Sequence, residues 1–152
     1  MTVSDTRTSG DDVSGREIRD RLEAAGHRVA DYRIVPDDVA AVRRLVTDLA
    51  ATRGIDAILL SGGTGVAPRD GTFEAVSALL DRRLDGFGEI FRSLSYAEIG
   101  SRAMLSRAVA GLVGRTALFS MPGSPAAVRL AMEKLIVPEL VHVVSEARKG
   151  LS

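Results

Sequence analysis

The stretch IDAILLSGGTGVAPRDGTFEAV, residues 55–76, decides the fold class of this 152-residue chain. Residues 55–61 are mostly apolar, which is typical of an interior strand in a parallel sheet, because both faces of such a strand are buried. Three glycines in four positions follow, and an amphipathic segment begins near Thr72. A strand, a glycine-rich turn and a crossover helix in this order predict a βα unit.

The N-terminal side of this stretch contains the same types of element. Ser14 and Glu17 have the spacing of a capping box, which predicts that a helix starts there. Residues 27–35 predict a strand, and the helix that follows is capped by Asp37 or Asp38. A second βα unit is therefore expected before residue 55.

The C-terminal side is less regular. Residues 85–115 predict short helices and loops, whereas residues 116–121, TALFSM, predict a further buried strand. Ser124 can cap the last helix, with Pro125 at its first position. The backbone N–H that proline lacks would have no partner within the helix there. Pro138 should kink or divide that helix. The whole pattern indicates an α/β fold with a mostly parallel sheet.

Composition limits the size and the partners of the protein. A chain of 152 residues, 45% of them hydrophobic, is predicted to form a single domain over residues 1–152. Twenty acidic and twenty basic residues cancel, so no overall field attracts nucleic acid or a membrane surface. The chain lacks an apolar run near the roughly 20 residues of a membrane span and the features of a signal peptide. A cytoplasmic location is expected.

The residue types exclude several kinds of site. The sequence contains no cysteine, which rules out disulfides and thiolate chemistry, and His27 and His142 lack the spacing of metal ligands. Only 4% of the residues are aromatic, too few to build a base-stacking surface for single-stranded nucleic acid. Any anion site must therefore come from local loops.

Four loops follow predicted strands. They are polar or glycine-rich, and they comprise residues 4–6, 36–38, 61–70 and 122–124. Because the carboxyl ends of parallel strands share one edge of the sheet, these loops should converge where ligands bind in α/β folds. The sequence predicts a composite pocket at this edge.

Each element of that pocket also has a purely structural interpretation. The glycines of SGGTG serve either a tight turn or a phosphate cradle, since neither a P-loop nor a GxGxxG motif is present. Asp37, Glu74, Arg69 and Ser124 are each explained by a helix cap, a first helical turn or an exposed surface. Asp70 has no evident structural role in its loop, and its charge would repel a phosphate unless a cation such as Mg²⁺ bridges the two.

Seven motifs are spread along nearly the whole chain: TVSDTR (2–7), DVSG (12–15), IVPDD (34–38), SGGTGVAPRDGTFEA (61–75), DGFGEIFRSLSYAEIG (85–100), AMLSRAVAG (103–111) and FSMPGSPAAV (119–128). In this order and spacing they resemble the MoaB/Mog family of molybdenum cofactor biosynthesis proteins, which is similar to the G domain of gephyrin. The middle segment is most similar to the short bacterial MoaB branch. PRDGTFEA looks like the catalytically competent pattern, which some MoaB proteins alter.

The resemblance implies a three-layer α/β/α fold that binds molybdopterin and adenylylates it with Mg-ATP, giving adenylyl-molybdopterin and pyrophosphate. Mg²⁺ is the implied cofactor and ATP the co-substrate. Two anions must approach each other in this reaction, so charge neutralisation is the main catalytic task. The resemblance also implies a homo-oligomer, a trimer or a pair of trimers, built on apolar segments within 86–112 and 137–144. A molybdate-insertion enzyme would act downstream.

The resemblance assigns roles to individual residues. Asp37 and Asp70 correspond to the two functional aspartates and would organise Mg²⁺ or position the reactants. Residues 62–65 would cradle nucleotide phosphates, and residues 122–124 would line the nucleotide pocket. Ser106 and Arg107 would help to hold the pterin phosphate. The full set of implied substrate and nucleotide contacts is Ser4, Asp5, Gly62, Gly63, Thr64, Gly65, Glu74, Ser106, Arg107, Pro122, Gly123 and Ser124.

Two alternatives to the enzyme interpretation stay open. The protein could be a molybdopterin-binding carrier or assembly partner without turnover, or a structural module that binds neither molybdopterin nor ATP. The intact PRDGTFEA motif favours the enzyme. The sequence departs from the family at its start, where only Met1, Thr2 and Val3 precede the SDT motif. We therefore expect a short first strand, or a sequence that begins inside a longer one.

Overall fold

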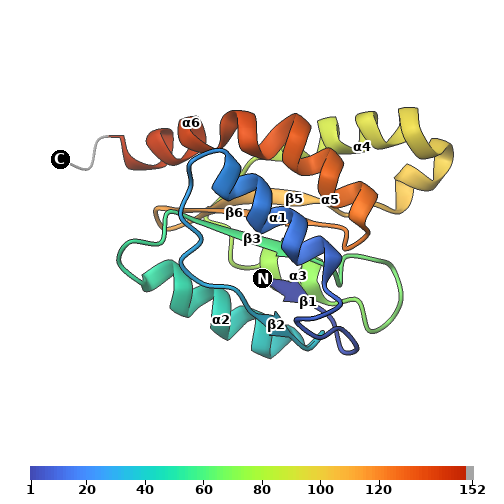
Figure 1. The fold of residues 1–152 in the computed structure, drawn as a ribbon, viewed down its shortest axis with the longest axis horizontal. Helices are drawn as coiled ribbons and strands as arrows, with labels where there is room; N and C mark the ends of the chain where they lie inside the picture. Colours follow the sequence, from blue (N-terminus) through green and yellow to red (C-terminus); the bar gives the residue numbers. More distant parts are fainter. Residues whose placement is uncertain (150–152) are drawn as a thin grey trace.

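The computed structural model describes residues 1–149 and is built around a six-stranded sheet (Figure 1). The strand order is β2-β1-β3-β6-β5-β4. Pairs β1–β2, β1–β3 and β3–β6 are parallel, whereas β5 is antiparallel to both β6 and β4. The predicted α/β class with a mostly parallel sheet is confirmed. The strands are β1 (Thr2–Val3), β2 (Ile34–Val35), β3 (Ala57–Ser61), β4 (Arg82–Arg83), β5 (Val109–Val113) and β6 (Thr116–Met121).

Helices cover both faces of the sheet, which gives the implied three layers (Figure 1). One face carries α1 (Val13–Ala24), α4 (Asp85–Ile99), α5 (Pro125–Ala131) and α6 (Val137–Arg148). The other face carries α2 (Val39–Ala51) and α3 (Thr72–Ser77). Within residues 1–149, none of the helices is both long and apolar enough to span a bilayer.

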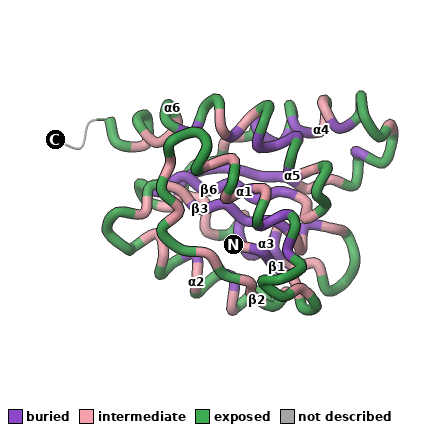
Figure 2. Tube along the Cα trace, in the orientation of Figure 1, coloured by how far each residue is buried: buried purple, intermediate pink, exposed green. Residues whose placement is uncertain are grey.

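The central strands β3 and β6 divide the core, because successive side chains of a strand point to opposite faces. Leu59 and Phe119 pack beneath the four-helix layer, whereas Ile58, Leu60 and Leu118 pack against α2 and α3. All six residues of β6 are buried. Figure 2 shows this buried centre between two layers of partly exposed helices.

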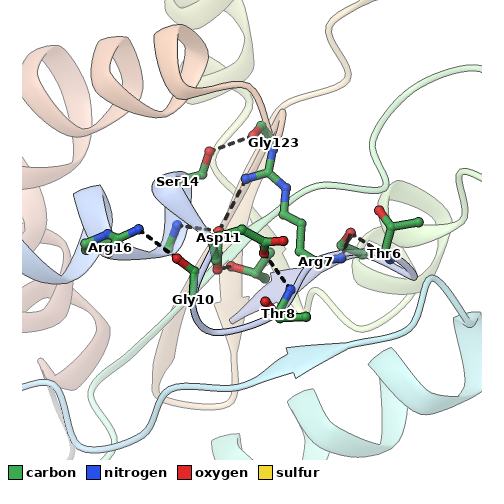
Figure 3. A network of polar contacts seen from close by, with 12 residues as sticks. Thr6, Arg7, Thr8, Gly10, Asp11, Ser14, Arg16 and Gly123 are labelled. Carbon is green, nitrogen blue, oxygen red and sulfur yellow. Dashed lines mark hydrogen bonds and ion pairs between the residues drawn. The ribbon is translucent and has the colours of Figure 1, made fainter.

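Asp12, rather than Ser14, caps α1. Its carboxylate accepts a hydrogen bond from the backbone N–H of Gly15 at 2.9 Å. Ser14 lies inside the first turn, and its hydroxyl donates to the carbonyl of Gly123 at 2.8 Å (Figure 3). The capping box predicted at Ser14 and Glu17 was therefore wrong, because an aspartate two residues earlier supplies the same capping chemistry.

The prediction of short helices and loops over residues 85–115 was also wrong. α4 alone is 15 residues long, and a 3₁₀ helix over Gly100–Leu105 and the strand β5 follow it. Phe87 and Phe91 lie one helical turn apart and are buried in the core. Gly86 and Gly88 weaken the local helix propensity in the first turn, so the packing of the phenylalanines decides the structure.

Two strands are shorter than the sequence predicted. The strand predicted over residues 27–35 is confined to its last two residues, because the two-residue β1 offers ladder partners only to Ile34 and Val35. β3 begins at Ala57 rather than at residue 55. The predicted division of the last helix is confirmed: Pro138 lies in the first turn of α6, directly after a π-helical turn over Met132–Ile136.

Asp12 connects the first strand, the first helix and the segment before β2. The hydroxyls of Thr2 and Tyr32 both donate to its carboxylate, and the guanidinium of Arg7 lies 3.5 Å from it. The residue is only 1% exposed. Burial alone would raise the pKa of Asp12, but the two hydroxyls and the Gly15 N–H outweigh it and hold the pKa below its ordinary value.

We expect Asp12→Asn to lower the free energy of unfolding by about 2–3 kcal/mol, because hydroxyl donors would lose a charged acceptor. Urea unfolding at pH 7 measures this loss. The stability that Asp12 contributes is present above the ordinary pKa of 3.8 and is lost as pH falls through the lower folded value. The difference between parent and variant should therefore shrink in acid. Asp31→Asn, at an exposed position, is the control. Equal losses in both variants would contradict the role of Asp12.

Candidate active site

Four loops meet at one edge of the sheet, as predicted. β1, β2, β3 and β6 run in the same direction, so the loops after them leave from their shared carboxyl edge (Figure 1). Specific hydrogen bonds join these loops. The backbone N–H of Asp37 donates to the carboxylate of Asp5 at 2.9 Å, and α1 is tied to the last loop through Ser14 and Gly123 (Figure 3).

Gly62 is the position where three strands come closest. Its φ of 104° lies in the left-handed region, and a Cβ there would lie 2.2 Å from the carbonyl oxygen of Val3. Its N–H donates to the carbonyl of Met121 at 3.1 Å. A Cβ at Gly123 would lie 3.0 Å from the Cα of Gly62. Side chains at these positions would separate the ends of β1, β3 and β6.

Gly63 and Gly65 make room for the two predicted catalytic aspartates. A Cβ at Gly63 would lie 2.8 Å from both carboxylate oxygens of Asp37, and one at Gly65 would lie 2.4 Å from Oδ2 of Asp70. Both carboxylates therefore pack directly on the glycine turn. The glycines serve turn geometry and also leave room for the two carboxylates.

Asp37 is not a helix cap, because the neighbouring Asp38 caps α2 through a backbone N–H of its first turn. The Oδ1 atom of Asp37 instead accepts the N–H of Gly71 at 3.3 Å. Burial raises the pKa of Asp37, and the negative charges of Asp70 and Asp5 raise it further, against that hydrogen bond and the Arg69 charge. The negative charges near this carboxylate therefore affect its pKa more strongly than the positive charge of Arg69 does.

Asp70 has a structural role, contrary to the expectation from sequence. Its Oδ2 atom accepts the backbone N–H of Ala67 at 2.9 Å and closes the loop behind the glycines. Its other oxygen, Oδ1, makes no hydrogen bond within the described part of the chain. One oxygen of Asp70 therefore holds the loop while the other remains available at the site.

Arg107 clamps the glycine loop. Its guanidinium donates to the carbonyls of Thr64 at 3.1 Å, of Asp70 at 3.1 Å and of Gly65. It also pairs with Glu74. The guanidinium carbon lies 5.0 Å from the ring centre of Phe73, a cation–π distance. These partners use most of its N–H groups, so a contact of Arg107 with a pterin phosphate stays a prediction.

Asp5 and Ser4 organise the loop after β1. The carboxylate of Asp5 pairs with the guanidinium of Arg69 in addition to accepting the N–H of Asp37. The hydroxyl of Ser4 accepts the backbone N–H groups of Thr6 and Arg7 at 3.3 and 3.2 Å. Asp5 thus bridges the loops after β2 and β3, whereas Ser4 stabilises its own turn.

The remaining predicted contacts are Glu74, Ser106, Pro122 and Ser124. Glu74 is exposed at the start of α3, and the hydrogen bond from Arg107 holds its pKa below the ordinary value although burial opposes this shift. Ser124 caps α5 through the N–H of Ala127 at 3.3 Å, which confirms its predicted structural role. Pro122 follows β6, and Ser106 ends the 3₁₀ helix.

Two residues have structural roles that the sequence did not indicate. Asp12 lay inside the quoted DVSG motif, but its spacing from Thr2 and Tyr32 gave no sign of the contact. Arg107 contacts three loop carbonyls, and its predicted contact with substrate stays a prediction. Long-range side-chain contacts of this kind have no local sequence pattern.

Asp37 and Asp70 by themselves offer too few ligands for a hard cation such as Mg²⁺. The other ligands would have to come from water or from a bound molecule. Among residues 1–149, no group of three or more His, Cys, Asp or Glu side chains is arranged to hold a metal. Mg²⁺ characteristically takes one or two carboxylates and completes its shell with water and substrate phosphates. Asp37 and Asp70 are two carboxylates on the same glycine turn, and this number is compatible with such coordination.

A hollow of about 390 Å³ lies away from these loops. It is enclosed by α1, the segment over residues 28–33, the first half of β3 and α6. The α-amino group of Met1 is buried beside it and donates to the carbonyl of Leu59 at 2.9 Å, and burial lowers its pKa to about 6. None of the predicted site residues lines this hollow.

Comparison with known proteins gives the family. The family described as a probable molybdopterin binding domain matches residues 1–142. Molybdenum cofactor biosynthesis protein B of Bacillus subtilis is 55% identical over 150 residues, which cover 98% of this chain and 88% of that protein. The chain belongs to the MoaB/Mog family.

Solved structures agree with this MoaB/Mog assignment. A crystal structure of molybdenum cofactor biosynthesis protein B, 52% identical, superimposes with a TM-score of 0.94 over 97% of this chain and 92% of that one. The tungsten cofactor synthesizing protein MoaB from Pyrococcus furiosus is 40% identical, with a TM-score of 0.87 over 97% and 94% of the two chains. The family resemblance and the fold inferred from sequence are therefore both confirmed.

We expect Arg107→Lys to loosen the glycine loop, because the single ammonium nitrogen of lysine cannot replace both Nε and Nη2, which contact different carbonyls. Hydrogen–deuterium exchange of residues 63–70 should become about tenfold faster, while global stability falls by about 1–2 kcal/mol. Glu74→Gln, which leaves the contacts with the carbonyls in place, is the matched control. Unchanged loop exchange in Arg107→Lys would show that the clamp is not needed.

Proposed function

We propose that this protein acts in molybdenum cofactor biosynthesis by adenylylating molybdopterin with Mg-ATP. Family membership supports the pathway, and the names of the relatives connect them with the molybdenum cofactor or, in one case, the tungsten cofactor. The observation that carries the finer proposal is the placement of Asp37 and Asp70 on the glycine turn, at the edge where four loops meet.

The charge distribution favours a site for phosphates plus a cation. Asp37 and Asp70 face the turn, and the neighbouring cations are already paired: Arg69 with Asp5, and Arg107 with Glu74 and loop carbonyls. Two phosphate-bearing substrates would meet net repulsion at such a surface. Mg²⁺ would neutralise this charge and join the carboxylates to the phosphates.

In the proposed reaction, a terminal phosphate oxygen of molybdopterin attacks the α-phosphorus of ATP. The new bond joins that oxygen to phosphorus, while the bond to the α,β-bridging oxygen breaks and pyrophosphate leaves with the electron pair. Asp37 and Asp70 position the reactants through their charge. Gly63, Thr64 and Gly65 present backbone N–H groups to the nucleotide phosphates, whereas the N–H of Gly62 is bonded to Met121. Arg107 keeps the loop in shape. No proton transfer by a side chain is required.

A molybdopterin carrier without turnover is the second candidate, because the same pocket could bind molybdopterin alone. One assay separates the two functions: the protein is incubated with molybdopterin, ATP and Mg²⁺, and adenylylated pterin and pyrophosphate are quantified. Pterin binding with no product would reject the enzyme and favour the carrier. If neither pterin nor ATP binds, only a structural module remains.

We expect Asp70→Asn to reduce turnover by about a hundredfold or more while the fold is retained. The amide oxygen of asparagine can still accept the N–H of Ala67, so the loop bond survives and the lost charge is tested on its own. Asp38→Asn is the matched control, since asparagine also caps helices well. Near-normal product formation by Asp70→Asn, measured in the same assay, would refute the role of its charge.

We also propose that the chain forms a homo-oligomer. Exposed apolar side chains gather on α4 and the 3₁₀ helix, where Ile90, Ile99, Met104 and Leu105 are each at least half exposed. Apolar surface of this kind commonly marks an interface. Light scattering at micromolar concentration should give the mass of a trimer or hexamer, and Met104→Asp with Leu105→Ser should shift it to the monomer. A parent protein of monomer mass would contradict the proposal.

A further inference from the structure

Thr72 has a buried hydroxyl that the fold does not use. The residue begins α3 and is 0% exposed. Its backbone N–H donates to the carbonyl of Gly63 at 2.9 Å, but its Oγ1 atom has no hydrogen-bond partner among residues 1–149. A buried hydroxyl without a partner is costly, since a valine of the same shape would avoid the loss of hydration.

The surroundings of this hydroxyl point to the candidate active site. A Cβ built on Gly63 would lie 2.1 Å from Oγ1 of Thr72 and 2.8 Å from each carboxylate oxygen of Asp37. The hydroxyl and the carboxylate therefore flank the same glycine. Any side chain at position 63 would push the two groups apart. The left-handed φ of 63° at this position is a second reason for glycine.

The Asp37 carboxylate is incompletely bonded as well. Its Oδ1 atom accepts one long hydrogen bond from the Gly71 N–H at 3.3 Å. Within the described residues, its Oδ2 atom accepts none. A donor without an acceptor and a carboxylate with free lone pairs thus lie beside each other. Small movements of the two side chains would join them.

We propose that Thr72 is a positioning residue for Asp37: its hydroxyl donates to that carboxylate when a divalent cation and a nucleotide are bound. The inference rests on the proposed function and adds a residue to it. Carboxylates that bind metals are usually held by a second hydrogen bond, which orients them and costs about 10–100-fold in affinity when it is removed. Thr72 supplies that bond from the core side of the site.

The test uses Thr72→Val, which removes the hydroxyl and keeps the shape, and Thr72→Ser, which keeps the hydroxyl. Mn²⁺ with a non-hydrolysable ATP analogue is the probe, and the water proton relaxation rate reports its binding to the full chain. Thr72→Val should bind the Mn²⁺–nucleotide complex about tenfold more weakly, and Thr72→Ser should restore most of the affinity. Ser77→Ala removes another unpartnered hydroxyl from the same helix and is the matched control.

Thermal unfolding of the same variants separates this role from a structural one. Thr72→Val should be as stable as the parent or more stable, because it removes an unpaired polar atom. Parent-like Mn²⁺–nucleotide affinity in Thr72→Val would overturn the inference, even if the parent adenylylates molybdopterin. Weakened affinity that Thr72→Ser does not restore would also overturn it. If the parent binds the complex and Thr72→Val does not, the inference holds whether or not product forms.

Discussion

The close approach of β1, β3 and β6 at Gly62 is the constraint on which the rest of the structure depends. A single Cβ at this position would collide with the carbonyl of Val3, and one at Gly123 would press on Gly62. Because backbone meets backbone here, the loops after all three strands start within one small region. The site is therefore a direct consequence of packing at the edge of the sheet, and its polar groups are placed by the core beneath it.

The arginines around this edge are paired within the protein. The arginines that a phosphate site would need are engaged with Asp5, Glu74 and loop carbonyls, and they hold the shape of the loops. Asp37 retains a raised pKa because burial and its acidic neighbours outweigh the single N–H that it accepts. Under the proposed function, a surface of this kind would favour a cation–phosphate pair over a free phosphate.

Much of the fold could be predicted from the sequence. Periodicity located the buried strands β3 and β6 because their apolar runs are continuous, and the loops at their carboxyl ends contained most of the candidate site. Prediction failed where local signals conflict with packing. Gly86 and Gly88 argue against a helix that Phe87 and Phe91 stabilise by burial, and the segment over residues 27–35 has strand propensity but few strand partners.

The sequence by itself determined the α/β class and the family, because hydrophobic periodicity and the order of motifs can be read from the chain alone. It also predicted Asp37 and Asp70 as site residues. Tertiary structure decided the role of each side chain. The contacts of Asp12 with Thr2 and Tyr32, and those of Arg107 with three loop carbonyls, join residues far apart in the chain. Such contacts are set by the packing of the sheet and its two helical layers, which no single stretch of sequence contains.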